Sequence, residues 1–401
     1  MSHTAGELVG SARNRHLALI LISNLCASAS WGVLSPTIVA GCIERGSSSL
    51  TIGILTSIWA LPFLVAAPLY TRIVGRINAR PALVVGMLAD AAAVWLFPVV
   101  PRDGAWIVLQ LATGALLGHF ALVTEAWLNL FASEDTRARV TSLYGIVPAM
   151  GYALGAAVYA LLGPRGYAPY LASSVSMVLG MLSLLPIPGE AADVVLGGEE
   201  RLGHAFRRAP LLLSVAVLAG VLEMVPWSLM QAYAVANQWS MRAAAFALPV
   251  FYWGQVLLTF PLGWLADRTP ARNVLLGTSS AAVICMVALA AWSQSAGMWL
   301  VTFLTGGIAT ATYTLGLAIL GQRFDAARLV SANAAFIACY GVGTILGPPS
   351  VGALMDVFGP RALPVALGCT SACIFLCAAM ARFEWRAPVR ACAVPPDARG
   401  V

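Results

Sequence analysis

Three acidic side chains stand inside long apolar stretches of this sequence. They are Asp90, Glu125 and Glu223. If these stretches cross a bilayer, each acid costs roughly 2.5–3.5 kcal/mol at mid-helix, so each is a candidate for binding an ion or relaying a proton. No arginine stands inside an apolar stretch, so none of the three has an obvious countercharge at its own depth.

Glu223 belongs to the strongest of the candidate patterns. Glu223, Trp227 and Gln231 follow one another at intervals of four residues and therefore share one face of a helix. Glu223 lies about 13 residues into its stretch, near the middle. The pattern predicts an acid beside an aromatic wall in a cavity. The alternative is a protonated glutamate that bonds to a neighbouring helix.

A similar stripe runs along the first apolar stretch. It consists of Asn24, Ser28, Trp31 and Ser35. Polar side chains on an apolar helix prefer the interior of a bundle to lipid. We expect Asn24, Ser28 and Trp31 to contact a substrate, although hydrogen bonding between helices would also account for the polar members.

Glu125 and Asp90 lead to weaker hypotheses. Glu125 stands about six residues from the end of its stretch, where an ion pair is favoured over substrate binding. The candidate partners are Arg72, Arg76, Arg137 and Arg139. For Asp90 the sequence suggests no partner.

The composition indicates which elements position these residues. Hydrophobic residues make up 60% of the 401 positions and charged residues 10%, with a mean hydropathy of +0.83. Soluble domains carry roughly 25% charged residues, so the chain is predicted to be an all-α, polytopic membrane protein. Twelve stretches are long enough to span a bilayer: 16–40, 49–71, 81–100, 105–131, 140–163, 167–187, 210–236, 244–266, 273–293, 297–320, 329–355 and 361–382.

The basic residues predict the orientation of these helices. All 23 are arginine. They stand in the segments that separate the apolar stretches and do not form the single patch typical of nucleic-acid binding. With the N-terminus inside, 18 arginines fall in inner segments and 5 in outer loops. The positive-inside rule therefore predicts both termini in the cytoplasm and a location in the cell inner membrane.

An internal repeat divides the chain into two halves. At an offset of 196 residues, five identities connect the halves: Trp31 with Trp227, Leu69 with Leu265, Arg72 with Arg268, Arg76 with Arg272, and Gly151 with Gly347. Repeated halves with a site between them are a known transporter design. We expect a first six-helix bundle in 1–187, a cytoplasmic linker in 188–209, a second six-helix bundle in 210–382 and a cytoplasmic tail in 383–401.

Several short motifs resemble those of one membrane family. GWLADRTPAR (Gly263–Arg272) and YGVGTILGPP (Tyr340–Pro349) resemble loop and helix motifs of the major facilitator superfamily. TEAWLN (Thr124–Asn129), followed by DTRARV (Asp135–Val140), is similar to the YcaD-like branch. The resemblance implies two pseudo-symmetric six-helix bundles that open alternately to each side, with helices 1, 4, 7 and 10 lining the cavity.

The resemblance also assigns a gating role to two cytoplasmic loops. Asp267 would bind the start of a helix in the other half, because a helix N-terminus offers unpaired N–H groups and partial positive charge. The other residues expected to take part in this gate are Arg268, Arg272, Arg72, Arg76 and Glu125. Thr71 and Gln110 replace an acid and an arginine of the family pattern. Because of the second replacement, proton antiport is not carried over from the resemblance alone.

Glycine and proline cluster in two of the predicted helices. Gly151, Gly343, Gly347 and Pro348 fall in the ranges 140–163 and 329–355. Glycine permits close backbone approach and proline removes one helical hydrogen bond. We expect these residues to act as a helix-packing hinge at the boundary between the halves, or simply to pack tightly.

The motifs point to transport and away from catalysis. The sequence contains no nucleophile–base set, phosphate loop or metal-ligand cluster, so we expect no enzyme activity, no cofactor and no metal. The leading hypothesis is a monomeric secondary transporter that exports a small cationic or amphiphilic solute in exchange for protons. One alternative is uptake of a neutral substrate or metabolite. Another is a non-transporting sensor or scaffold in the membrane.

Overall fold

The computed structural model describes the chain except for residues 1, 63–78, 133, 188–208, 325 and 382–401. Its described residues form helices and no strand. The helices are α1 (Ser2–Glu44), α2 (Ser49–Ser57), α4 (Ala79–Ala93), α5 (Leu96–Val99), α6 (Asp103–Phe131), α7 (Glu134–Leu162), α8 (Ala168–Leu184), α10 (Pro210–Ala236), α11 (Met241–Ala244), α12 (Ala247–Arg268), α13 (Ala271–Trp292), α14 (Gly297–Arg323), α15 (Ala326–Phe358) and α16 (Ala362–Met380).

Each of the twelve predicted stretches contains helix in the part that the structure describes. Ten helical segments among the described residues are long and apolar enough to cross a membrane, and two shorter apolar ones span Ser49–Pro62 and Ala168–Leu184. The predicted all-α membrane fold is therefore confirmed. Several helices extend past the predicted ends, since α1 reaches Ser2 and α15 begins at Ala326.

Three prolines break helices that the hydropathy pattern predicts as continuous. Each proline follows a two-residue turn: Pro62 follows Ile58–Trp59, Pro98 follows Val94–Trp95, and Pro249 follows Ala245–Phe246. A proline ring clashes with the carbonyl group of the residue four positions earlier. In each case that residue is the first one of the turn. The predicted spans 81–100 and 244–266 are present as Arg80–Val99 and Met241–Arg268, and each is interrupted by a turn that the hydropathy pattern does not predict, between α4 and α5 and between α11 and α12.

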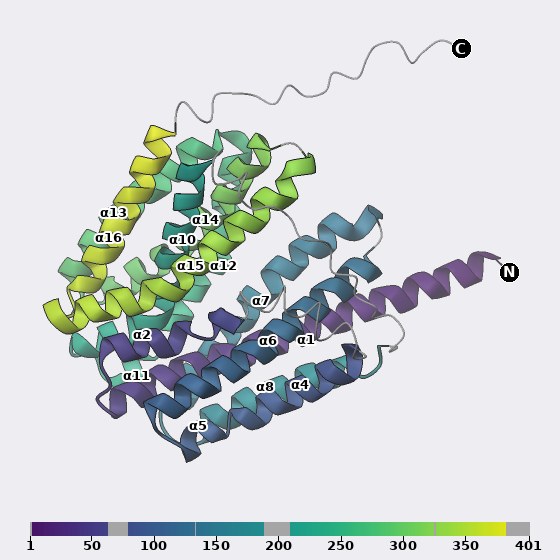
Figure 1. The fold of residues 1–401 in the computed structure, drawn as a ribbon, viewed down its shortest axis with the longest axis horizontal. Helices are drawn as coiled ribbons and strands as arrows, with labels where there is room; N and C mark the ends of the chain where they lie inside the picture. Colours follow the sequence, from purple (N-terminus) through teal and green to yellow (C-terminus); the bar gives the residue numbers. More distant parts are fainter. Residues whose placement is uncertain (1, 63–78, 133, 188–208, 325, 382–401) are drawn as a thin grey trace, which may run out of the picture.

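The helices form two halves with the same internal arrangement (Figure 1). In the first half α1 packs on α7 and α8, and in the second half α10 packs on α15 and α16. These pairs correspond at the 196-residue offset of the sequence repeat. Across the halves, α2 contacts α15 and α7 contacts α12. At the same offset α2 corresponds to α12 and α7 to α15, so the two contacts are equivalent under the repeat.

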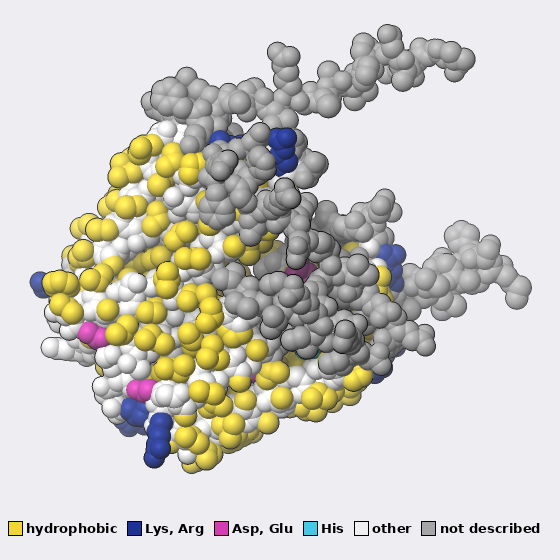
Figure 2. Space-filling model, viewed as in Figure 1, with side chains coloured by type: hydrophobic (Ala, Val, Ile, Leu, Met, Phe, Trp, Pro, Cys, Tyr) yellow, Lys and Arg dark blue, Asp and Glu magenta, His cyan; other side chains and the backbone are white. Residues whose placement is uncertain are grey.

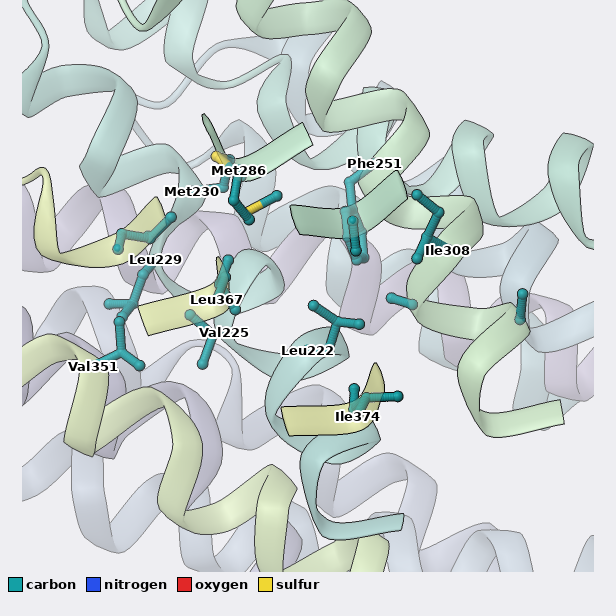
Figure 3. Packing of buried hydrophobic residues seen from close by; sticks show 14 of the residues in the cluster. Leu222, Val225, Leu229, Met230, Phe251, Met286, Ile308, Val351, Leu367 and Ile374 are labelled. Atoms are coloured by element: carbon teal, nitrogen blue, oxygen red, sulfur yellow. The ribbon is translucent and has the colours of Figure 1, made fainter. Parts of the chain in front are cut away.

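Apolar side chains fill the second half and also cover the outside. Figure 3 shows Leu222, Val225 and Leu229 of α10 packed against side chains of α13, α15 and α16. The described part of the face in Figure 2 is also largely apolar, with basic side chains toward its edges. A surface of this kind suits hydrocarbon, because a soluble monomer rarely exposes apolar patches larger than a few hundred Å².

The chain direction defines two sides of the molecule. We call the side at which α1 begins and α16 ends the termini side, and the opposite side the far side (Figure 1). α7 and α10 run from the termini side to the far side, and α12 runs back.

Candidate functional site

A pocket of about 430 Å³ lies between the two halves. Its walls come from α7 of the first half and from α10, α12 and α14 of the second. Tyr152, Trp227, Phe251 and Tyr252 supply aromatic surface, and Glu223 is the one acid among the described lining residues. Among its described lining residues the pocket therefore combines apolar walls with a single carboxyl group and no basic side chain.

The Glu223 carboxyl is hydrogen-bonded on both oxygens. Gln255 of α12 donates from Nε2 to Oε1 over 3.0 Å, and the Tyr340 hydroxyl of α15 donates to Oε2 over 2.9 Å. Tyr340 is itself held edge-on against Tyr313 of α14, with ring centroids 4.7 Å apart. Three helices of the second half thus fix the position of one acid that borders the pocket.

Five aromatic rings form a continuous layer on the far side of the pocket. We call this set, which consists of Trp31, Trp59, Tyr152, Trp227 and Tyr252, the aromatic layer. Trp59 contacts Trp31 at 5.3 Å and Trp227 at 5.8 Å between ring centroids. Tyr152 stacks on Tyr252 at 5.5 Å and contacts Trp227 at 5.6 Å. Trp31, Trp59 and Tyr152 belong to the first half and Trp227 and Tyr252 to the second, so three of these four ring contacts cross between the halves.

The six residues that the sequence singles out for the substrate or proton site occupy four different places. Glu223 and Trp227 line the pocket, and Trp31 lies in the aromatic layer behind Trp59. Gln231 lies beyond the layer and donates to the Tyr159 hydroxyl of α7 over 2.8 Å, which joins the halves on the far side. The other two are buried in α1, where Asn24 donates to its own helix at Ile20 and Ser28 lies next to Gly151.

Trp59 and Tyr152 were not among the predicted residues. Trp59 stands well inside a predicted span, as Trp31 and Trp227 do, so the same criterion could have found it. Tyr152 follows Gly151 directly and carries no pattern of its own. Its place opposite Tyr252 depends on the packing of α7 against α12.

The predicted gating residues are only partly within the described chain. Asp267 is exposed at the end of α12, and Arg268 lies over the Trp264 ring at 3.8 Å. Arg272 donates from Nε to the Ala378 carbonyl over 2.8 Å, which ties α13 to α16 within the second half. Glu125 is exposed on α6. Arg72 and Arg76 lie outside the described residues, so their pairing with these groups stays a prediction.

The predicted hinge residues make close contacts mostly within each half. A Cβ atom on Gly151 would overlap the backbone of α1, and one on Gly343 would overlap the Val217 carbonyl of α10. Gly347 approaches Val221, which also belongs to α10. Only the Pro348 carbonyl reaches the other half, at Gly53 of α2. This placement favours tight packing for the three glycines and leaves their hinge role a prediction.

We expect Gly343→Ala to destabilise the protein by about 1–3 kcal/mol, because the added methyl group must displace the backbone of α10. The measurement is thermal unfolding of the purified protein in detergent. Gly263→Ala is the matched control, since a Cβ atom at that position would meet no atom of another described helix within 4 Å. Equal unfolding temperatures for the two variants would contradict the tight contact.

Asp90 is buried in α4, with 3% of its surface exposed. Neither carboxyl oxygen has a hydrogen-bond partner among the described residues. The residue lies in the first half, away from the pocket walls.

Comparisons with known proteins identify relatives along nearly the whole chain. The family model described as Major Facilitator Superfamily matches residues 20–233 and 212–393. The uncharacterized MFS-type transporter YfkF of Bacillus subtilis (strain 168) is 25% identical over 356 residues, which cover 86% of this chain and 89% of YfkF. The uncharacterized MFS-type transporter YcaD of Escherichia coli O7:K1 is 22% identical over 369 residues, which cover 90% and 94% of the two chains.

Solved structures share the fold at low sequence identity. The nucleoside transporter NupG superposes with a TM-score of 0.76 at 15% identity and covers 92% of this chain and 99% of its own. A bacterial homologue of the human lysosomal transporter Spinster, in an inward-facing and unoccupied conformation, superposes with a TM-score of 0.70 at 15% identity and covers 94% and 99%.

Proposed function

Because this chain belongs to the Major Facilitator Superfamily and is a membrane transporter, we propose that it exports a small cationic or amphiphilic solute in exchange for protons. The observation that carries the proposal is the pocket between the halves, whose described lining has aromatic walls and a single acid. Aromatic faces attract cations by about 0.5–2 kcal/mol, and a carboxylate adds charge complementarity. The chain acts as a transporter and not as an enzyme.

The conformation fits one step of alternating access. Ile146 and Phe260 line the pocket nearer to the termini side than the aromatic layer does. On the far side, Gln231 and Tyr159 join the halves. With both termini in the cytoplasm, as the arginine distribution predicts, this state is inward-facing.

Glu223 is the proposed proton site. It borders the pocket, and its oxygens contact Gln255 and the Tyr340 hydroxyl. A hydroxyl group can donate to an ionised carboxylate or accept from a protonated one. Tyr340 can therefore stay bonded to Glu223 before and after a proton is released, which suits a group that changes protonation during the transport cycle.

One observation favours uptake or export of a neutral cargo instead. Both Glu223 oxygens already accept hydrogen bonds from the protein, so the acid could serve the proton cycle alone. The cargo would then contact only the aromatic walls. The fold neighbour NupG is described as a nucleoside transporter, and a nucleoside is a neutral probe with a ring that could stack on such walls.

Proteoliposomes with an internal pH indicator test these proposals. We expect ethidium, an aromatic cation, to trigger a proton flux that protein-free liposomes lack, and a pH gradient to drive ethidium across the membrane. A flux with uridine but not with ethidium would support the neutral cargo. Folded protein that moves neither probe and no protons would favour the sensor or scaffold.

The proposed orientation in the inner membrane predicts the behaviour of fusion proteins. A C-terminal green fluorescent protein is expected to fluoresce, and alkaline phosphatase fused at the same place to be inactive, because the C-terminus is cytoplasmic. A truncated chain that carries phosphatase after Gly166, between α7 and α8, should be active. The reverse pattern would overturn the orientation.

A further inference from the structure

On the far side, a carboxylate of the second half bonds to the backbone of the first half. Asp356 stands at the end of α15 in the second half and faces the start of α2 in the first half. Its Oδ1 accepts a hydrogen bond from the Ser49 backbone N–H over 2.7 Å, and its Oδ2 accepts one from the Leu50 N–H over 2.9 Å. The first N–H groups of a helix have no partner within the helix, so a side chain from the other half supplies their acceptors.

The chemistry of this contact favours an ionised acid. A negative charge is stabilised at a helix N-terminus by the partial positive charge there, and hydrogen bonds to a carboxylate are roughly twice as strong as neutral ones. The Ser48 hydroxyl accepts from the next free donor, the Thr51 N–H, over 3.1 Å. The start of α2 is thus capped once by its own half and twice by the other half.

Glycines on both helices let the backbones meet beneath this contact. A Cβ atom on Gly53 of α2 would overlap the Pro348 carbonyl of α15, and one on Gly352 of α15 would overlap the Ser49 carbonyl of α2. Any larger residue at either position would hold the halves apart. The carboxylate therefore sits at the end of an inter-half contact about one to two helical turns long.

We propose that Asp356 is a far-side latch: its bonds to Ser49 and Leu50 hold the far side shut and open when the pocket becomes accessible from that side. The proposal rests on alternating access as the proposed function. Two ion pairs on the far side of the described chain, Arg45–Asp103 and Arg165–Glu44, cannot take this role, because each joins elements of the first half.

Two variants remove the latch from opposite sides. Asp356→Ala deletes the acceptor. Ser49→Pro deletes one donor, and proline is well tolerated at the first position of a helix. Ser48 precedes it with φ −66° and ψ 158°, which is the extended conformation that a residue before proline adopts. Asp103→Asn is the matched control, since it breaks a far-side ion pair with Arg45 that does not cross between the halves.

Hydrogen–deuterium exchange in nanodiscs provides the readout and needs no cargo. For both latch variants we expect the far-side state to open on the order of tenfold more often. Exchange should then rise in 49–57 and in 343–358, and fall at the termini side in 260–268. Asp103→Asn should show the exchange of the wild type in all three segments.

A helix cap with no latch function would give a different result. Exchange would then change in 49–57 alone, or not at all, for both Asp356→Ala and Ser49→Pro, and that outcome would overturn the proposal. Because no transport is measured, failure of the latch would leave the cargo proposal standing. Conversely, if the exchange pattern shows the latch but the proteoliposomes move neither ethidium nor uridine, only the proposed cargo is refuted.

Discussion

Replacing Glu223 with glutamine is expected to reduce the ethidium-triggered proton flux to the level of protein-free liposomes. Glutamine keeps the size of the side chain and can still bond to Gln255 and Tyr340 but has no proton to release. Ethidium should still exchange across the membrane in the absence of a pH gradient. The measurement is the internal pH of proteoliposomes after ethidium is added outside.

Glu44→Gln is the matched control for this experiment. Glu44 lies at the far side and pairs with Arg165 over 3.2 Å, with both side chains well exposed. Such surface pairs contribute about 0–1 kcal/mol, so the proton flux should equal that of the wild type. An undiminished flux in Glu223→Gln would show that another group carries the proton.

Trp227→Ala is expected to weaken ethidium binding on the order of tenfold to a hundredfold. Trp227 lines the pocket and contacts the rings of Trp59, Tyr152 and Tyr252. Its loss removes a cation-binding face and interrupts the aromatic layer, and each aromatic contact contributes about 0.5–1.5 kcal/mol beyond its buried area. Fluorescence anisotropy of ethidium with purified protein measures the Kd.

Trp239→Ala separates binding from a general loss of stability. Trp239 also packs against a ring, that of Trp299 at 5.1 Å, and its Nε1 donates to the Ser293 carbonyl. It does not line the pocket. Both variants should lower the unfolding temperature, but only Trp227→Ala should raise the Kd. Wild-type binding by Trp227→Ala would argue against the pocket as the cargo site.

The membrane fold could be predicted because the bilayer imposes a local rule. A helix must run for about 20 apolar residues before its backbone can meet water, so hydropathy locates the spans one at a time. The breaks before Pro62, Pro98 and Pro249 are also local, and attention to the residue four positions earlier would have placed them. The 196-residue repeat likewise anticipates which helices correspond.

The candidate site could be predicted only in part. Glu223 and Trp227 stand on one helix, and their four-residue spacing places them on one face. The same rule included Gln231, which the structure places beyond the aromatic layer. Helical spacing predicts the face of the helix on which a side chain lies. It does not predict where along that face the pocket ends, so it cannot separate pocket residues from those beyond the aromatic layer.

By itself, the sequence determined the membrane class, the twelve helical stretches, the correspondence of the halves and the acid at the centre of α10. Only the tertiary structure decided the partners of that acid, since Gln255 and Tyr340 lie 32 and 117 positions away. It alone placed Asp356 against Leu50, 306 positions apart. Spans follow from the transfer of single segments into lipid. The contacts of Glu223 depend on how the helices of one bundle pack together, and those of Asp356 depend on how the two bundles pack against each other.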